Sequence, residues 1–268
     1  MKNSVTSYWN NNRIKLLYLL GSLFLLASAG LGIFLGSADI SLADILDAFQ
    51  RGFNASSGTR IFGYSRLPRM LASLVCGAAL SVSGAVIQGV LANRLASPSV
   101  IGVNAGAGLA VTICTALGIY GGWQLSVFSF AGAFGAVMLV SLASRRWGAS
   151  RGTVILIGVA MNSLLGALSD TVTTLIPEVG VMSNDFKVGE FSSVTYPKLM
   201  PALVIVAVVI ALLYTFHNEL DILTLGEENA RGLGMNTSAM RTLFLLFAAL
   251  LSGCAVSLAG LLSFVGLL

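Results

Sequence analysis

Charged residues are scarce in this sequence. Asp, Glu, Lys and Arg make up 10% of its 268 residues, while hydrophobic residues make up 56%. Soluble domains average about 25% charged residues, so too few are present to cover a water-soluble globule of this length. The scarcity excludes a soluble protein and predicts an integral membrane protein. Because the apolar runs are continuous and do not alternate, we expect spanning helices and not barrel strands.

Residues that carry catalysis or hold metals are also few. The sequence has three cysteines and a single histidine. Cys76, Cys114 and Cys254 lie apart in apolar runs, which favours helix packing over a disulfide or a thiolate metal site. His217 stands near two acidic residues where a span ends, and a solvated helix end is more common there than a metal site. With no catalytic set to assemble, we expect no enzyme, no metal and no cofactor.

Motifs for nucleotides and nucleic acids are missing as well. None of the four lysines follows a glycine, as a P-loop lysine would, and the glycines at 102, 106 and 108 do not form GxGxxG. The net charge of +4 is spread over short loops, without a basic cluster interleaved with aromatics. Membrane topology and contact with phospholipid explain this charge better than nucleic acid does.

Apolar segments of membrane length dominate what is present. There are seven, at about 15–36, 68–91, 99–118, 123–143, 152–176, 199–217 and 241–260. They predict an all-α polytopic transmembrane bundle, which we take as a single domain over residues 1–268. Loops at 37–67, 177–198 and 218–240 are longer than the others. With a cytoplasmic N-terminus, nine basic residues fall inside and six outside, which agrees weakly with the positive-inside rule.

Small residues crowd the segment at 68–91. They recur at Gly77, Ser81, Ala85 and Gly89, with Gly84 beside them. In lipid, small residues let helix backbones approach closely, so we expect a crowded interior helix. Gln88, one turn from Gly84, fits an interhelical hydrogen bond or a substrate contact. Gly102, Gly106 and Ala110 repeat the pattern in the next segment.

Asp170 is an acidic residue inside an apolar segment. An intramembrane carboxylate faces a bundle interior or an aqueous cavity by default. Pro177 follows within two turns, so the residue is either part of a pathway or a helix-end residue near water.

Several motifs together resemble the permease subunit of ABC importers for iron–siderophores, haem and vitamin B12, the FecCD type. They are RLPR at 66–69, the run GAALSVSGAVIQGVLANRLASPSVIGVNAGAGLA that follows, LIGVAMNS at 156–163, VGEFSSVTYPKL at 188–199, LTLGEENARGLGM at 223–235 and SLAGLLSFVGLL at 257–268. The resemblance implies a ten-helix fold, of which this chain lacks the last three helices. It also implies a dimer of permease subunits, two cytoplasmic ATPase subunits and an external substrate-binding protein.

The resemblance assigns roles to two groups of residues. Arg66 and Arg69 would face outside and pair with acidic residues of the binding protein, although anchoring to lipid headgroups is the alternative. The 223–240 loop would couple to the ATPase through a short amphipathic helix. Its candidate residues are Leu225, Gly226, Glu227, Glu228, Ala230, Arg231, Gly232, Leu233 and Gly234. Candidates for the translocation pathway or for helix packing are Gly77, Ser81, Gly84, Gln88, Gly106, Asn162 and Asp170.

The sequence therefore predicts a multi-pass permease of the bacterial inner membrane that moves an iron chelate inward, most often a ferric siderophore in this family. ATP hydrolysis would belong to its partner. The alternative is a secondary transporter or channel driven by an ion gradient. Such a protein would need paired intramembrane charges or broken helices at matching places in two halves.

Overall fold

The computed structural model describes residues 2–36, 38–120, 122–146 and 151–262. Two parts of the sequence lie outside the described residues. They are residues 147–150, in the loop 145–151 that carries three arginines, and residues 263–268, the end of the motif SLAGLLSFVGLL. The chain forms two compact units, Met1–Met70 and Leu71–Leu268.

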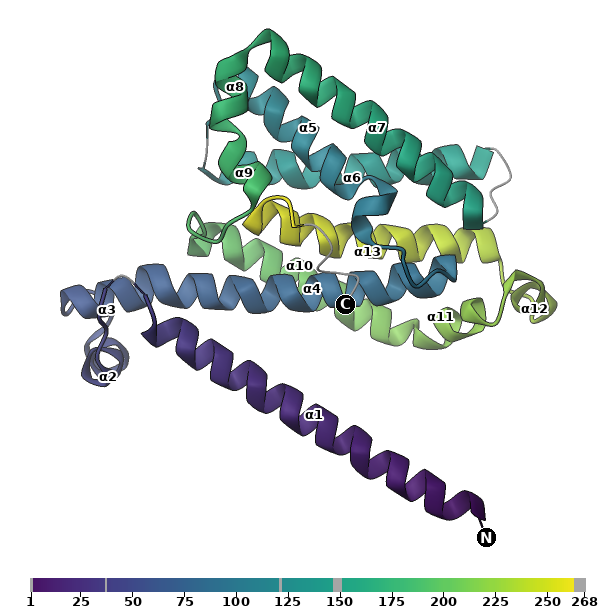
Figure 1. Cartoon of the computed structure of the whole chain (residues 1–268), viewed down its shortest axis with the longest axis horizontal. Helices are drawn as coiled ribbons and strands as arrows, with labels where there is room; N and C mark the ends of the chain where they lie inside the picture. The colour runs from purple at the N-terminus through teal and green to yellow at the C-terminus, as the bar shows by residue number, and fades with distance from the viewer. Residues whose placement is uncertain (1, 37, 121, 147–150, 263–268) are drawn as a thin grey trace. The chain divides into compact units, whose positions relative to one another are not determined.

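The N-terminal unit is mostly helical, with short non-helical stretches between its helices (Figure 1). It contains α1 (Lys2–Phe34), α2 (Leu42–Arg51), α3 (Ser57–Ile61) and the π-helical turn η1 (Phe62–Arg66), and α4 begins at Leu67. A small core forms around Ile40, Ala48 and Phe62. The 37–67 region, which the sequence predicts to be a loop, is therefore mostly helical.

Two capping boxes explain why this region forms helices. The Ser41 hydroxyl accepts a hydrogen bond from the Asp44 amide, and the Asp44 carboxylate accepts one from the Ser41 amide. Ser56 and Thr59 make the same exchange at the start of α3. Each box satisfies backbone amides that a helix start leaves without partners. Hydrogen bonds from Ser41 and then Ser56 hold the pKa of Asp44 below its ordinary value.

The larger unit holds the remaining helices in this order: the rest of α4 (Leu67–Leu91), the 3₁₀ turn η2 (Pro98–Ile101), α5 (Val103–Ala116), α6 (Gly122–Arg146), α7 (Arg151–Leu175), α8 (Pro177–Met182), α9 (Asn184–Val188), α10 (Tyr196–Thr215), α11 (His217–Thr224), α12 (Glu227–Gly232) and α13 (Thr237–Ala259). The predicted loops at 177–198 and 218–240 thus each contain two short helices.

Six helices in the described residues are long and apolar enough to cross a membrane. They are Arg13–Phe34, Ser57–Leu91, Gly122–Ser144, Arg151–Leu175, Tyr196–Thr215 and Thr237–Ala259. The prediction of a multi-pass helical membrane protein is confirmed. The predicted segment at about 99–118 differs, because Pro98 opens a 3₁₀ turn and Gly102 has a φ of 99°. The 14-residue α5 that remains rises roughly 21 Å, less than a bilayer core of about 30 Å.

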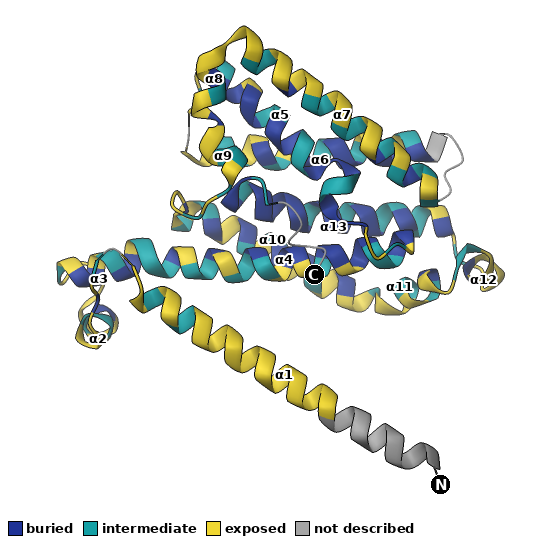
Figure 2. Cartoon of the chain, in the orientation of Figure 1, coloured by how far each residue is buried: buried dark blue, intermediate teal, exposed yellow. Residues whose placement is uncertain are grey.

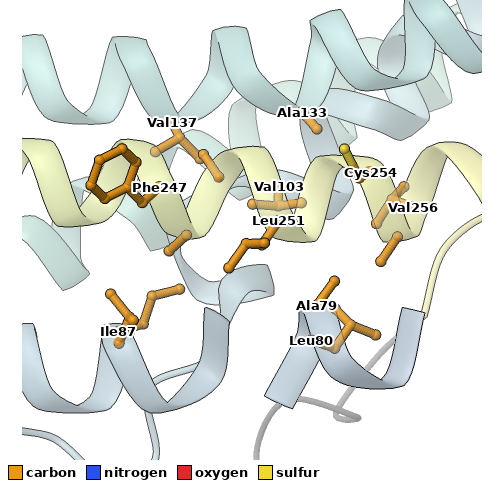
Figure 3. Packing of buried hydrophobic residues seen from close by; sticks show 14 of the residues in the cluster. Ala79, Leu80, Ile87, Val103, Ala133, Val137, Phe247, Leu251, Cys254 and Val256 are labelled. Carbon is orange, nitrogen blue, oxygen red and sulfur yellow. The ribbon is translucent and has the colours of Figure 1, made fainter. Parts of the chain in front are cut away.

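Helix α13 lies at the centre of the larger unit. Most of its residues are buried (Figure 2), and side chains of α4 and α6 flank it on opposite sides (Figure 3). The Ser83 hydroxyl in α4 donates a hydrogen bond of 2.9 Å to the Ala248 carbonyl oxygen in α13. The three cysteines are buried within helices, as the sequence predicts.

Candidate functional site

Two glycines shape the α11–α12 segment, which we define as residues 217–234. Gly226 separates the two helices with a φ of 110°, and Gly234 follows α12 with a φ of 83°. Residues with a side chain rarely adopt these angles, so glycine is the residue that permits both turns. A short helix is thereby set off between two sharp changes in chain direction.

The apolar residues of this segment differ in how far they are buried. Ala230 is completely buried, whereas Leu225 and Leu233 are 63% and 67% exposed. Glu228 and Gly232 are also exposed, and a β-carbon on Gly232 would meet no described atom within 4 Å. Two large apolar side chains exposed within a charged segment are candidate contacts for another protein.

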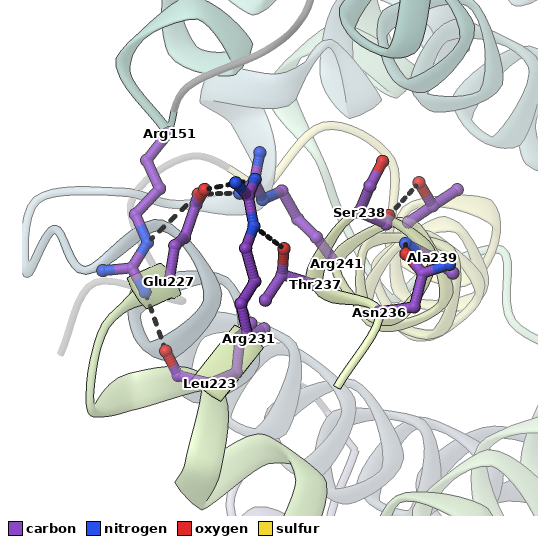
Figure 4. A network of polar contacts seen from close by, with 10 residues as sticks. Arg151, Leu223, Glu227, Arg231, Asn236, Thr237, Ser238, Ala239 and Arg241 are labelled. Atoms are coloured by element: carbon purple, nitrogen blue, oxygen red, sulfur yellow. Dashed lines mark hydrogen bonds and ion pairs between the residues drawn. The ribbon is translucent and has the colours of Figure 1, made fainter. Parts of the chain in front are cut away.

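One carboxylate fastens α12 to the rest of the unit (Figure 4). Glu227, the first residue of α12, pairs through Oε1 with Arg241 of α13, and Arg151 Nε of α7 lies 4.0 Å from the same oxygen. Arg231, one turn along α12, lies 3.5 Å from Oε2. We call these four residues the Glu227 clasp.

Two further hydrogen bonds surround the clasp (Figure 4). Arg151 Nη2 donates to the Leu223 carbonyl oxygen at the end of α11 over 2.7 Å. Arg231 Nε donates to the Thr237 hydroxyl at the start of α13 over 3.2 Å. The clasp therefore joins α11, α12, the first residue of α7 and the first turns of α13.

Sequence reasoning identifies only Glu227 and Arg231 of this cluster. Arg151 and Arg241 stand at the starts of two spans, where basic residues are expected on grounds of topology alone. Their convergence on Glu227 depends on how α7 and α13 pack together, which no local pattern reveals.

The predicted small-residue face of α4 lies partly in the core and partly at the surface. Gly84 is buried, and a β-carbon on Gly89 would contact Thr224 of α11 at 3.4 Å. Ser81 is exposed, and a β-carbon on Gly77 would meet no described atom within 4 Å. Gln88 is half-buried, and its backbone carbonyl accepts a bond from the Asn93 amide.

The packed side of α4 is formed by a different set of residues. Ala79, Ser83 and Ile87 recur every fourth residue and are fully buried. The four-residue period that the sequence shows is real, but the core meets the helix on the opposite side, because residues two positions apart point in nearly opposite directions from an α-helix.

Four residues spaced one turn apart make a single face of α7. Gly158 packs against η2 so closely that a β-carbon would lie 2.4 Å from the Val100 carbonyl oxygen. The Asn162 amide donates to the carbonyl oxygens of Ser99 and Val100 at 2.8 and 3.2 Å. Gly166 and Asp170 continue the same face.

This face of α7 lines a cavity of about 470 Å³. Asn162, Gly166 and Asp170 contribute from α7, Asn104 and Gly108 from α5, and Lys187 from α9. Asp170 is exposed there. The structure thus brings two predicted pathway residues, Asn162 and Asp170, to one cavity. Gly106 instead contacts Gly132 of α6, on a packed side of α5.

Arg66 and Arg69 belong to the N-terminal unit and differ in their surroundings. The Arg66 guanidinium donates to the carbonyl oxygens of Leu35 and Ala38, just after the end of α1. Arg69 is exposed. Arg66 therefore has a structural role within its own unit, whereas Arg69 presents its side chain at the surface.

Nothing in the described residues resembles a metal centre, since no three His, Cys, Asp or Glu side chains gather there. His217 lies at the start of α11, where its ring stacks on Tyr214 and bonds to the Tyr214 carbonyl oxygen at 2.9 Å.

Comparison with known sequences gives a consistent picture. Residues 22–268 match the model of the FecCD transport family. An uncharacterised ABC transporter permease of Bacillus subtilis is 34% identical over 96% of this chain and 76% of its own length. The iron(3+)-hydroxamate import system permease of Bacillus subtilis is 34% identical over 92% of this chain and 65% of its own length. The hemin transport system permease of Yersinia pestis is 30% identical, with coverages of 96% and 78%.

Among the solved structures that are similar in fold is an inward-facing conformation of a metal-chelate type ABC transporter. Its TM-score is 0.80 at 26% sequence identity, and the match covers 94% of this chain and 78% of that one.

Proposed function

This chain belongs to the FecCD transport family, and from that premise we propose that it is the permease subunit of an ABC importer that carries an iron chelate inward. A ferric siderophore is the cargo we favour. Relatives at 30% identity or more include permeases named for Fe(3+)-citrate, iron(3+)-hydroxamate, ferric enterobactin and hemin.

The observation that carries the proposal is the construction of the α11–α12 segment. Leu225 and Leu233 are exposed on either side of a short helix, while Glu227 ties that helix to two membrane spans. A surface that receives force needs both parts: an apolar contact for the partner and a firm attachment to the elements that must move. We propose that the partner is a cytoplasmic ATPase subunit.

The cavity beside α7 is the proposed place for cargo to pass. Its lining combines the amides of Asn104 and Asn162 with the charges of Asp170 and Lys187. Intramembrane polar groups of this kind mark substrate pathways in membrane proteins. A second permease subunit, a copy of this chain or a related one, would complete the pathway.

The outer partner in this proposal is a substrate-binding protein, and the exposed Arg69 is the arginine that would meet it. The proposed location is the inner membrane of a bacterium, where residues 1–268 act as one permease domain. The chain would bind and guide cargo without making or breaking covalent bonds.

Co-purification tests the proposal directly. The chain is expressed with the ATPase and the binding protein of an iron-chelate importer from the same cell. We expect a stable permease–ATPase complex whose ATP hydrolysis rises when the loaded binding protein is added. Failure of the chain to retain any ATPase subunit in detergent and in nanodiscs would contradict the proposal.

A further inference from the structure

We propose that the Glu227 clasp is the joint through which movement of α12 reaches the wall of the cavity beside α7. The inference rests on the proposed function, because it assumes that a partner moves α12. It adds the route of transmission and names Glu227, Arg151 and Arg241 as positioning residues.

Glu227 is a partner that two spans share. Arg241 and Arg151 both point to Oε1 of Glu227, one from α13 and the other from α7 (Figure 4). Arg151 also bonds to the Leu223 carbonyl oxygen. A displacement of α12 thus pulls on the first residue of α7 and on α13 together.

The burial of each arginine determines how much its ion pair with Glu227 contributes to holding α12. The Arg231 side chain is 67% exposed, so its pair with Glu227 contributes little. The Arg241 side chain is 7% exposed and that of Arg151 is 20% exposed. Breaking a buried pair by removing one partner is strongly unfavourable, because the remaining charge keeps its desolvation cost without its attraction.

Charge counting shows why the carboxylate cannot be replaced by a neutral group. The clasp contains three guanidinium groups and one carboxylate. Without the negative charge, Arg151 and Arg241 would face each other as two partly desolvated cations. Their repulsion would separate α7 from α13 at this end and would not merely loosen one contact.

The chain on either side of α12 offers little stiffness of its own. Gly226 and Gly234 flank the helix at positive φ, and a β-carbon on either would meet no described atom within 4 Å. Together with the buried Ala230 and the Arg231–Thr237 hydrogen bond, the clasp holds the helix against the rest of the unit. Removal of the clasp would let α12 turn about its glycines without moving the spans.

In this proposal, movement of α12 is transmitted along α7 to the cavity. Asn162 and Asp170 lie on the helix that begins at Arg151. At about 1.5 Å per residue they stand roughly 16 and 28 Å along the axis of α7 from the clasp. A rigid helix carries a tilt at its first residue to both positions, so the clasp links α12 to the cargo cavity.

The first test measures whether the clasp holds α12 to α7. Spin labels are placed on Asn229 of α12 and Leu156 of α7, both exposed, in the full chain with its three cysteines replaced by serine. The distance distribution is recorded in nanodiscs, with no ATPase and no chelate present. Glu227→Gln should broaden the distribution, and Glu178→Gln, which removes an exposed acid of α8 outside the α11–α12 segment, should leave it narrow.

The second test measures transmission in the complex with ATPase and binding protein. Glu227→Gln should keep ATPase binding but lower ATP-driven uptake about tenfold, which corresponds to a loss of about 1.4 kcal/mol. Glu178→Gln should retain wild-type uptake. Arg151→Gln, which leaves the Arg241 pair intact, should also broaden the distance distribution and lower uptake, so the proposal stays testable if Glu227→Gln does not fold.

The outcomes separate the two proposals. A narrow distribution in both clasp variants, or wild-type uptake in either of them, would overturn the clasp as a joint. A wild-type chain that binds no ATPase would instead overturn the proposed function, whatever the distance measurement shows.

Discussion

Gly106 of α5 and Gly132 of α6 lie against each other backbone to backbone. A β-carbon on Gly106 would come within 2.3 Å of the Gly132 carbonyl oxygen, and one on Gly132 within 2.4 Å of the Gly106 carbonyl oxygen. Such reciprocal contact leaves no room for a methyl group on either helix. The two helices cross at the distance that only small residues allow in a membrane.

This contact predicts that Gly106→Ala destabilises the protein. The backbones must move apart to admit the methyl group, and overpacking of this kind costs about 1–3 kcal/mol. Thermal unfolding in detergent measures the effect as a lower midpoint. Gly135→Ala in α6 is the matched control, because its β-carbon would meet no described atom within 4 Å. Equal midpoints for the two variants would show that the helices do not cross in this way.

The exposed leucines of the α11–α12 segment predict a partner contact. Leu225→Ser with Leu233→Ser should abolish co-purification with the ATPase while leaving the permease folded, because both side chains are already exposed. Removal of exposed anchors lowers affinity without a cost to the core. The control is Leu95→Ser, since Leu95 is 77% exposed and lies outside the segment. Undiminished ATPase binding in the double variant would place the docking surface elsewhere.

The position of Asp170 predicts access from water. Asp170→Cys, in a chain without Cys76, Cys114 and Cys254, should react with a small charged thiol reagent added from outside. Val154→Cys on the same helix should stay protected, because Val154 is completely buried. Protection of both positions in every nucleotide state would make the cavity a dry contact between helices.

Because Arg66 and Arg69 have different surroundings, we expect substitutions at the two positions to have different effects. Arg69→Gln should weaken binding-protein affinity roughly 1.5- to 5-fold, since exposed ion pairs give about 0.2–1 kcal/mol. Arg69→Glu should weaken it further through repulsion, and added salt should reduce both differences. Arg66→Gln should instead lower the stability of the N-terminal unit, because it loses two hydrogen bonds to the end of α1. Unchanged affinity for Arg69→Glu at low salt would make this arginine a lipid anchor.

Sequence alone predicts the long spans well and the short elements poorly. Runs of about 20 apolar residues identify a spanning helix whatever its neighbours are. The segment at 99–118 is misjudged, because its composition is mostly apolar while the 3₁₀ turn Pro98–Ile101 and the positive φ of Gly102 occupy its start. The helices α2 and α3 are missed although their capping boxes, Ser41 with Asp44 and Ser56 with Thr59, are legible in the sequence.

The candidate site also combines local features that the sequence reveals with packing contacts that it does not. The sequence names Gly226 and Gly234 among the coupling residues, and the structure shows both at positive φ on either side of α12. The partners of Glu227 are not predicted, because Arg151 and Arg241 reach it from two other helices. For the close approach of Gly106 to Gly132, the small-residue pattern predicts Gly106 as a packing residue. Its partner Gly132 is known only from the packing of α5 on α6.

Uptake into proteoliposomes tests the central claim most directly. The permease is reconstituted with its ATPase, and a loaded binding protein carrying radiolabelled ferric hydroxamate is placed on the outer face. The account predicts accumulation of iron that requires ATP inside the vesicles, survives ionophores that collapse proton and sodium gradients, and stops when the binding protein is omitted. Accumulation that proceeds without ATP and disappears with the ionophores would contradict it and would establish a transporter driven by an ion gradient.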